Sequence, residues 1–247
     1  MVCAPIPFHD IETVFLDVGN TLVSMDYVWI GDELASAGVS TELDALMRAE
    51  AASRPVISRA VAGEGSTEGL SIFELYLKTI LNNLGTSTDA IPALVERLVP
   101  IFRGPGRERL WSYVLPGVPE ALEQLKSLGR TLAVLSNSDG TVEQVLERQG
   151  LRPYLTAVFD SHLVGFEKPD PRFFRHALEA TGARAEATLH VGDLYSADIE
   201  GGRAAGVHTA LVDPFDDWDD VDCPRFKDLE ALSQTFRASV GREPDHT

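Results

Sequence analysis

Cysteine and long apolar runs are both scarce in this sequence of 247 residues. The two cysteines, Cys3 and Cys223, lie near opposite ends of the chain, so we expect neither a disulfide framework nor a cysteine metal site. This use of cysteine agrees with a protein of the reducing cytoplasm. No apolar run reaches the length that crosses a bilayer. The first residues, MVCAPIPFHD, lack the basic and apolar regions of a secretory signal. We therefore expect a cytoplasmic location and no membrane partner.

Positive charge is also in short supply. The chain has 21 Lys and Arg residues against 38 Asp and Glu residues, which gives a formal net charge of −17. This charge argues against a nucleic-acid backbone or an anionic membrane as partner. A small phosphorylated substrate stays compatible, because a local cationic pocket or a divalent metal ion can override the field of the whole protein. We expect a monomer or a homodimer.

Strand-like patterns are missing from residues 24–111. Apolar residues recur there at helical spacing in segment after segment. A helix that runs towards Arg54 is interrupted by Pro55, and Gly63–Gly69 is expected to be a loop. The other expected helices of this region cover residues 26–37, 70–84 and 89–102.

From residue 116 onwards, short apolar runs alternate with amphipathic segments. This alternation predicts a parallel, doubly wound sheet with helices on its faces. The strand expected over Val14–Leu16 is separated from the other strands by the helical region, which we therefore interpret as an insertion that forms a cap over the crevice. The fold class is thus α/β, with a core of residues 1–23 and 112–247 and an all-helical cap of residues 24–111. The later strands are expected at residues 131–135, 158–160, 188–191 and 209–212, and the helices at 120–128, 141–149, 171–181 and 199–205.

The last part of the chain carries weaker signals. Asp216–Asp222 is densely acidic, but it lacks the glycine and the final glutamate of a calcium loop, so we expect a solvated surface loop. Pro224–Phe226 is expected to be an edge strand and Leu229–Phe236 a helix. The terminus at Gly241–Thr247 is expected to fray.

Polar side chains gather after the expected strands. In an open α/β sheet the carboxyl ends of the strands form one edge, and the ligand crevice lies there. A turn, a helix cap or a surface lysine would explain each of these residues alone. Their shared position at strand ends is hard to explain by capping. The residues are Asp17, Ser136 with Asn137, Lys168, and Asp193 with Asp198.

These motifs resemble those of the haloacid dehalogenase-like hydrolase superfamily. The first motif matches DVGNTL from Asp17, the second VLSN up to Asn137, the third Lys168, and the fourth GDLYSAD up to Asp198. The stretch PGVPEALEQLKSLG before the second motif is also typical. The resemblance covers nearly the whole chain, and it implies that the helical insertion is the C1 cap of that superfamily.

The resemblance also implies roles for the motif residues. Asp17 would be the nucleophile that takes the phosphoryl group as an aspartyl-phosphate. Lys168 would offset the repulsion between Asp17 and the phosphate, and Ser136 with Asn137 would donate hydrogen bonds to phosphoryl oxygens. The substrate would be a small phosphorylated metabolite and the cofactor Mg²⁺, a hard cation that prefers oxygen ligands. Its implied ligands are Asp17, the Gly19 carbonyl, Asp193 and Asp198, the last either as a ligand or behind the ligands.

One position departs from the phosphatases of the superfamily. Most of them carry a second Asp two residues after the nucleophile, which protonates the leaving group and later activates water. Here that position is Gly19. General acid–base catalysis contributes ~10²–10⁴ in rate, so an alkyl phosphate should react poorly unless Asn20, a cap residue or the substrate itself supplies the proton.

Gly19 therefore leaves three functions open. A Mg²⁺-dependent phosphatase, weak or restricted to good leaving groups such as acyl or aryl phosphates, agrees best with the acidic fourth motif. A 2-haloacid dehalogenase needs no general acid, but such enzymes usually carry an aromatic residue at this position and no acidic fourth motif. A non-catalytic relative would bind a phosphorylated ligand or a protein. A phosphonatase would need a cap lysine, and Lys78, the only candidate, is better explained as a surface residue.

Substrate specificity is expected to reside in the cap. Five residues are candidate contacts, although core packing explains the aromatic ones more simply and a solvated charge or exposed ion pair explains each arginine. His162, His190 and His208 are expected to pack or cap rather than to catalyse. The candidate contacts are Tyr27, Trp29, Arg54, Arg59 and Trp111.

Overall fold

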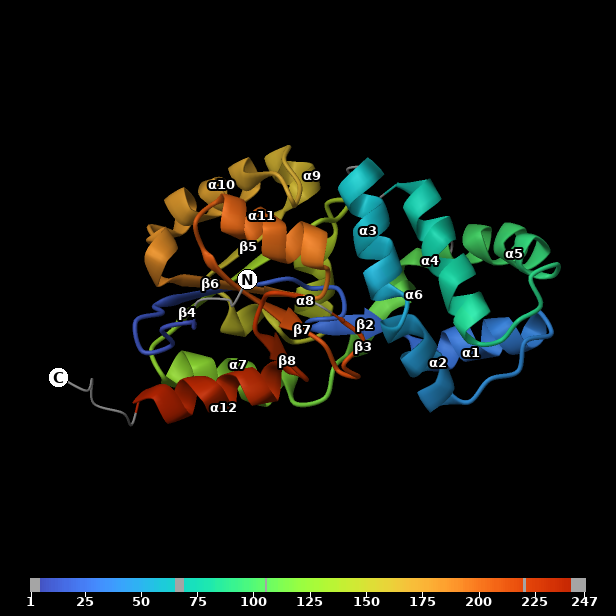
Figure 1. The fold of residues 1–247 in the computed structure, drawn as a ribbon, viewed down its shortest axis with the longest axis horizontal. Coiled ribbons are helices and arrows are strands. Elements are labelled where there is room, and N and C mark those ends of the chain that lie inside the picture. The colour runs from blue at the N-terminus through green and yellow to red at the C-terminus, as the bar shows by residue number, and fades with distance from the viewer. Residues whose placement is uncertain (1–4, 65–68, 105, 220, 241–247) are drawn as a thin grey trace.

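The computed structural model describes residues 5–64, 69–104, 106–219 and 221–240. Most of the expected Gly63–Gly69 loop, the Gly241–Thr247 terminus and Cys3 lie outside this part. The described residues form a parallel sheet of six strands in the order β5-β4-β1-β6-β7-β8, flanked by helices (Figure 1), and a separate antiparallel pair, β2-β3. The α/β, doubly wound core is confirmed. The strands of the main sheet are β1 (Thr13–Leu16), β4 (Thr131–Ser136), β5 (Ala157–Asp160), β6 (Thr188–Gly192), β7 (His208–Val212) and β8 (Arg225–Phe226).

Both faces of the sheet are buried, which explains why its strands are almost continuously apolar. Side chains alternate between the two faces of a strand, so Val14 and Leu16 join one core cluster and Phe15 joins another. In Figure 1, α7 and α12 lie on one side of the sheet and α10 and α11 on the other. The core helices are α7 (Val118–Ser127), α8 (Val142–Arg148), α9 (Ser161–Val164), α10 (Pro171–Thr181), α11 (Gly201–Ala204) and α12 (Leu229–Val240), with a π-helical turn at Tyr195–Glu200 and short 3₁₀ turns at Arg152–Tyr154 and Ala185–Ala187.

Residues 26–110 form a helical segment between β2 and β3. Its helices enclose an apolar cluster of their own, distinct from the two clusters on the sheet. None of the helices in the described residues is long and apolar enough to cross a membrane. The helices are α1 (Tyr27–Ser36), α2 (Leu43–Ala51), α3 (Arg54–Glu64), α4 (Leu70–Asn83), α5 (Ile91–Arg103) and α6 (Arg107–Leu110).

Two local expectations for this region need correction. Two short strands, β2 (Val23–Met25) and β3 (Trp111–Val114), pair with each other where the helical segment joins the sheet. They escape sequence analysis because each has only a few residues and its partner lies almost ninety positions away. The expected interruption at Pro55 lies slightly earlier: α2 ends at Ala51, and Pro55 is the second residue of α3, where the missing backbone N–H costs nothing.

The acidic loop at 216–222 is less solvated than expected. Trp218 is buried, and Asp217 accepts a hydrogen bond from Arg48 of α2 at 2.5 Å. Tyr195 and Arg203 both bind Asp222. The loop therefore connects the core with the helical segment.

Candidate active site

The polar residues at the strand ends line one cavity of about 360 Å³, between the sheet and the helical segment. Four charged side chains form its floor, each at most 7% exposed. Ser136 and Asn137 line the same cavity. The structure thus brings together every residue that the sequence motifs singled out. The floor consists of Asp17, Lys168, Asp193 and Asp198.

Lys168 is the centre of the floor. Its ammonium group donates to Asp17 Oδ1 at 2.6 Å and to Asp198 Oδ1 at 2.7 Å. Burial acts to lower the pKa of Lys168, but these two carboxylates outweigh it and raise the pKa. The lysine therefore stays protonated and fixes the position of Asp17, which follows β1 directly.

Asp198 supports Lys168 from behind. Its Oδ1 also contacts His190 Nε2 at 2.8 Å, and its Oδ2 accepts from the backbone N–H of Leu194 at 2.9 Å. Burial acts to raise the pKa of Asp198, but Lys168 and His190 lower it well below its usual range. A side chain on Gly192 would overlap this carboxylate, since its Cβ would lie 2.1 Å from Asp198 Cγ. Asp198 was expected either to bind the metal ion directly or to lie behind the metal ligands. Its contacts agree with the second alternative.

The loop after β4 holds the backbone of Lys168. Asn137 Nδ2 donates to the carbonyl of Lys168 at 2.8 Å, and Asn137 Oδ1 accepts from its N–H at 2.7 Å. Asn137 thus holds the backbone of Lys168, and its expected hydrogen bond to a phosphoryl group stays a prediction. Ser136, 5% exposed, makes only a long contact of 3.4 Å with the Asn137 carbonyl, so its hydroxyl stays suited to a ligand.

The remaining carboxylates of the floor are poorly compensated. Burial, followed in effect by the repulsion from Asp198, raises the pKa of Asp17 to about 6, although Lys168 opposes the shift. Burial raises the pKa of Asp193 to about 8; Arg54 opposes this shift, and Asp17 and Asp198 add to it. The three carboxylates share a single ammonium group, so the floor carries two uncompensated negative charges when all are ionised.

This charge pattern fits a divalent cation. Asp17 and Asp193 offer carboxylate oxygens, which Mg²⁺ prefers, and a charge of +2 would balance the floor. No group of three or more His, Cys, Asp or Glu side chains in the described residues has the arrangement of a metal site. A metal ion would therefore be held by two carboxylates, together with backbone carbonyl groups such as that of Gly19, substrate oxygens and water.

Above the floor lies a second buried network, the roof, which the sequence did not predict. Glu50 is fully buried and accepts hydrogen bonds from Arg54 Nε at 2.9 Å and Arg54 Nη2 at 2.7 Å. Tyr27 donates to the same carboxylate at 3.0 Å, and Tyr76 also binds it. Burial acts to lower the pKa of Arg54, but Glu50 raises it above its ordinary value. The roof consists of Tyr27, Glu50, Arg54 and Tyr76.

The roof and the floor are joined at Asp193. Arg54 Nε lies 3.6 Å from Asp193 Oδ2, which also accepts from Asn20 Nδ2 at 3.1 Å. Asn20 in turn contacts the hydroxyl of Tyr76 at 3.3 Å and accepts from Ser24. The expectation that Arg54 is solvated was wrong: it is 4% exposed, because its charge is neutralised by Glu50, four residues earlier near the end of α2.

The other candidate contacts fall into two classes. Tyr27 and Trp29 are buried in the core of the helical segment, and Arg59 is exposed. Trp111 lines the cavity beside Gly19. A Cβ on Gly19 would lie 3.7 Å from the indole and 3.8 Å from Asp17 Oδ2, so the place of the missing acid is flanked by an aromatic ring.

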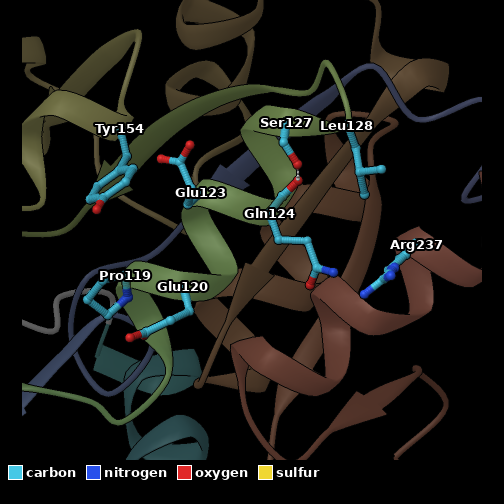
Figure 2. A pocket seen from close by; sticks show the side chains of 8 residues that line it. All are labelled: Pro119, Glu120, Glu123, Gln124, Ser127, Leu128, Tyr154 and Arg237. Atoms are coloured by element: carbon cyan, nitrogen blue, oxygen red, sulfur yellow. Dashed lines mark hydrogen bonds between the residues drawn. The ribbon is translucent and has the colours of Figure 1, made fainter.

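A second depression of about 570 Å³ lies between α7 and α12 (Figure 2). None of the motif residues lines it. Glu120, Glu123 and Arg237 are exposed there, and Ser233 Oγ donates to the side-chain Oε1 of Gln124 at 2.6 Å. The residues that line this surface include no buried charged side chain, so we place the chemistry of the site in the first cavity.

The family model of the haloacid dehalogenase-like hydrolases matches residues 11–206. This span contains every residue of the floor and the roof. The chain belongs to this family of hydrolases.

Relatives of known name are similar over much of the chain. The haloacid dehalogenase-like hydrolase domain-containing protein 3 of Bos taurus is 31% identical over 204 residues, 79% of each chain. A phosphoglycolate phosphatase of Aquifex aeolicus is 32% identical over 62% of this chain and 76% of its own. The hydrolase therefore has phosphatases among its relatives.

Solved structures share the fold. A 2-haloacid dehalogenase from Pseudomonas syringae has a TM-score of 0.55 and 24% identity, over 92% of this chain and 99% of its own. YfnB of Bacillus subtilis, described as a HAD-hydrolase bound to magnesium, has a TM-score of 0.61 and 20% identity, over 92% and 98%. These likenesses establish the architecture of the core, and function must be argued from the site.

Proposed function

We propose that this hydrolase is a Mg²⁺-dependent phosphatase of a small phosphorylated metabolite, with the helical segment as a cap over the active site. The observation that carries the proposal is the floor of the cavity. A fixed carboxylate, Asp17, is held by a buried lysine in a site whose carboxylates outnumber its cations. Such a site favours a ligand that arrives with a divalent cation, which is how phosphate groups are commonly bound.

The residues of the floor support a two-step displacement. A carboxylate oxygen of Asp17 would bond to phosphorus while the bond to the leaving oxygen breaks, giving an aspartyl-phosphate. Water would then release inorganic phosphate and restore the carboxylate. Lys168 and Ser136 would bind phosphoryl oxygens as charge moves onto them, and Asn137 keeps Lys168 in place.

Mg²⁺, held by Asp17, Asp193 and the Gly19 carbonyl, would neutralise the charge of the phosphate and of the floor. The named phosphatase among the relatives and the magnesium-bound structural neighbour agree with this assignment. The cap would exclude water and select the leaving group.

A panel of phosphate esters and acyl phosphates, measured with and without Mg²⁺, tests this function. We expect metal-dependent phosphate release that Asp17→Asn lowers by ~10⁴-fold or more, as for the loss of a catalytic nucleophile. Asp170→Asn, a change of a half-buried carboxylate outside the cavity, should leave the rate unchanged. If no compound of the panel releases phosphate, and phosphate or a protein binds tightly, the results would instead favour a non-catalytic relative.

Trp111 gives a second candidate some support. An aromatic ring stands beside Gly19, where related dehalogenases usually carry an aromatic side chain. Metal-independent release of chloride from 2-chloropropionate would establish a 2-haloacid dehalogenase. The negative charge around Asp193 favours the phosphatase, because a halide leaving group requires no metal ion.

A further inference from the structure

The cavity wall above Gly19 has a different character from the floor. Trp111 and apolar side chains of the helical segment form it, and four of these apolar side chains are at most 9% exposed, while charged side chains such as Arg103, Arg107 and Arg148 also line the cavity. The leaving half of a phosphorylated substrate must lie beyond the phosphoryl group, between the floor and this wall. The four buried side chains are Ile57, Ile72, Phe73 and Leu110.

Such a wall discriminates between kinds of leaving group. A sugar or glycerol unit would place several hydroxyl groups against apolar side chains, and each hydroxyl without a partner is costly. A planar ring would lose little water and would gain contact with the indole of Trp111 and the ring of Phe73. The wall therefore favours an unsaturated ring next to the phosphate.

The chemistry at Gly19 leads to the same class of substrate. Because position 19 carries no carboxyl group, a leaving oxygen that can depart as an anion is favoured. The hydroxyl of a phenol has an ordinary pKa of about 10, as in tyrosine, so a phenolate leaves far more readily than the anion of an alkyl alcohol. The absence of the acid matters least for an aryl phosphate.

We propose that the substrate is a phosphate monoester of a phenol-type alcohol, whose ring packs against Trp111. This inference rests on the proposed phosphatase function. A carboxylate oxygen of Asp17 bonds to phosphorus as the bond between phosphorus and the aryl oxygen breaks, and the electron pair leaves on the phenolate. The phenolate takes its proton from solvent, and water hydrolyses the aspartyl-phosphate.

Four compounds distinguish the effect of the ring from the effect of a good leaving group on the rate. Phenyl phosphate has both, acetyl phosphate has a good leaving group without a ring, and cyclohexyl phosphate has a ring of similar size with an alkyl oxygen. Glycerol phosphate has neither. With Mg²⁺ present, we expect kcat/KM for phenyl phosphate to exceed that for cyclohexyl phosphate by ~10²-fold or more, the scale of the missing acid.

Substitutions at Trp111 test the contact with the ring. Trp111→Leu should lower kcat/KM for phenyl phosphate about tenfold, mainly through KM, as expected for the loss of an aromatic pair. It should change the value for acetyl phosphate by less than about threefold, and Trp111→Phe should restore most of the loss. Tyr113→Leu, an aromatic change on the same strand outside the cavity, is the matched control and should have no effect.

The outcomes that overturn the inference are distinct from those that overturn the function. Phosphate release from acetyl and alkyl phosphates with no preference for phenyl phosphate would end the inference and leave the phosphatase standing. An equal loss for acetyl and phenyl phosphate in Trp111→Leu would also end it. No release from any of the four compounds would overturn the phosphatase, and the inference with it.

Discussion

Two groups of buried charges meet at the cavity, one in the floor and one in the roof. In the roof, Glu50 at the end of α2 and Arg54 at the start of α3 form an ion pair, and tyrosine hydroxyl groups also bind the carboxylate. In the floor, Asp17 and Asp198 both form ion pairs with Lys168. The ion pair of Asp193 with Arg54 is longer, at 3.6 Å. The charges of Glu50 and Arg54 balance each other without a ligand, although Arg54 Nη1 is a buried donor that has no hydrogen-bond partner in the described residues, whereas the charges of the floor do not balance. We infer that the roof is built for stability and the floor for binding.

Removing the charge of Glu50 should produce the largest change in stability. Glu50→Gln leaves the buried guanidinium of Arg54 with the more distant carboxylate of Asp193, 3.6 Å away, as its counter-ion, and breaking a buried pair in this way costs about 3–5 kcal/mol. Denaturant unfolding measures the loss. Glu74→Gln is the matched control, because Glu74 and Lys78 form an exposed pair with the same spacing, worth less than about 1 kcal/mol. Equal losses in the two variants would show that the roof is not a buried ion pair.

The missing acid can be restored at Gly19. Gly19→Asp should raise kcat/KM for alkyl phosphates by ~10²-fold or more, because a Cβ there meets only ordinary contacts with Trp111 and Asp17. The gain for phenyl phosphate should be much smaller, since a phenolate needs no proton. An unchanged rate for alkyl esters would contradict the account of the missing acid.

Removing a carboxylate from the floor should stabilise the protein, whereas removing the carboxylate of Glu50 from the roof should destabilise it. Folding raises the pKa of Asp193 from 3.8 to about 8, so the folded protein loses stability as the pH rises between these values. Asp193→Asn abolishes this loss, and without metal it should be more stable than the wild type at pH 9 by at least about 1 kcal/mol. The difference should vanish near pH 4.

Asp170 provides the control for this experiment. Its pKa is lowered by the hydrogen bond from Arg172, so its charge adds stability above its ordinary pKa, and this stability is lost as the pH falls. Asp170→Asn should therefore be no more stable than the wild type at any pH. A destabilised Asp193→Asn at pH 9 would mean that the floor is already compensated.

The smallest expected effect concerns a contact between the two regions. Ser58 Oγ of α3 accepts from the backbone N–H of Ser196 at 2.8 Å, next to the residues of the floor, and Ser196 Oγ donates to the carbonyl of Ser58 at 2.7 Å. Ser58→Ala leaves a buried N–H without its partner and should cost about 1–2 kcal/mol. Ser127→Ala, which removes an exposed hydroxyl, should cost less in the same unfolding measurement.

The floor could be predicted from the sequence because Asp17 and Asp193 follow apolar strands directly, and Lys168 and Asp198 lie in the segments that come after strand ends. Strand ends in a parallel sheet share one edge, so Asp17, Lys168 and Asp193 converge once the strands are recognised. Their partners could not be predicted. That Asn137 holds Lys168, or that Asp198 faces the lysine, depends on loop conformations that no periodic pattern encodes.

The roof escaped prediction for a different reason. Tyr27, Glu50 and Tyr76 lie on three helices, at positions that read as ordinary amphipathic sequence. Only the packing of α1, α2 and α4 brings their polar ends together. The i, i+4 spacing of Glu50 and Arg54 was the one available signal, and it indicates an ion pair without indicating its burial.

The most direct test of the central claim is the thermal unfolding of the wild type and of Asp193→Asn, with and without Mg²⁺ at pH 8 and constant ionic strength. Ligand at 100 times its Kd stabilises a protein by about 2.7 kcal/mol, and for a chain of this size each kcal/mol raises Tm by about 2–4 °C. We predict that Mg²⁺ raises the Tm of the wild type by several degrees and that of Asp193→Asn hardly at all. An equal rise in both proteins, or none in the wild type, would contradict the claim that the floor is incomplete without a divalent cation.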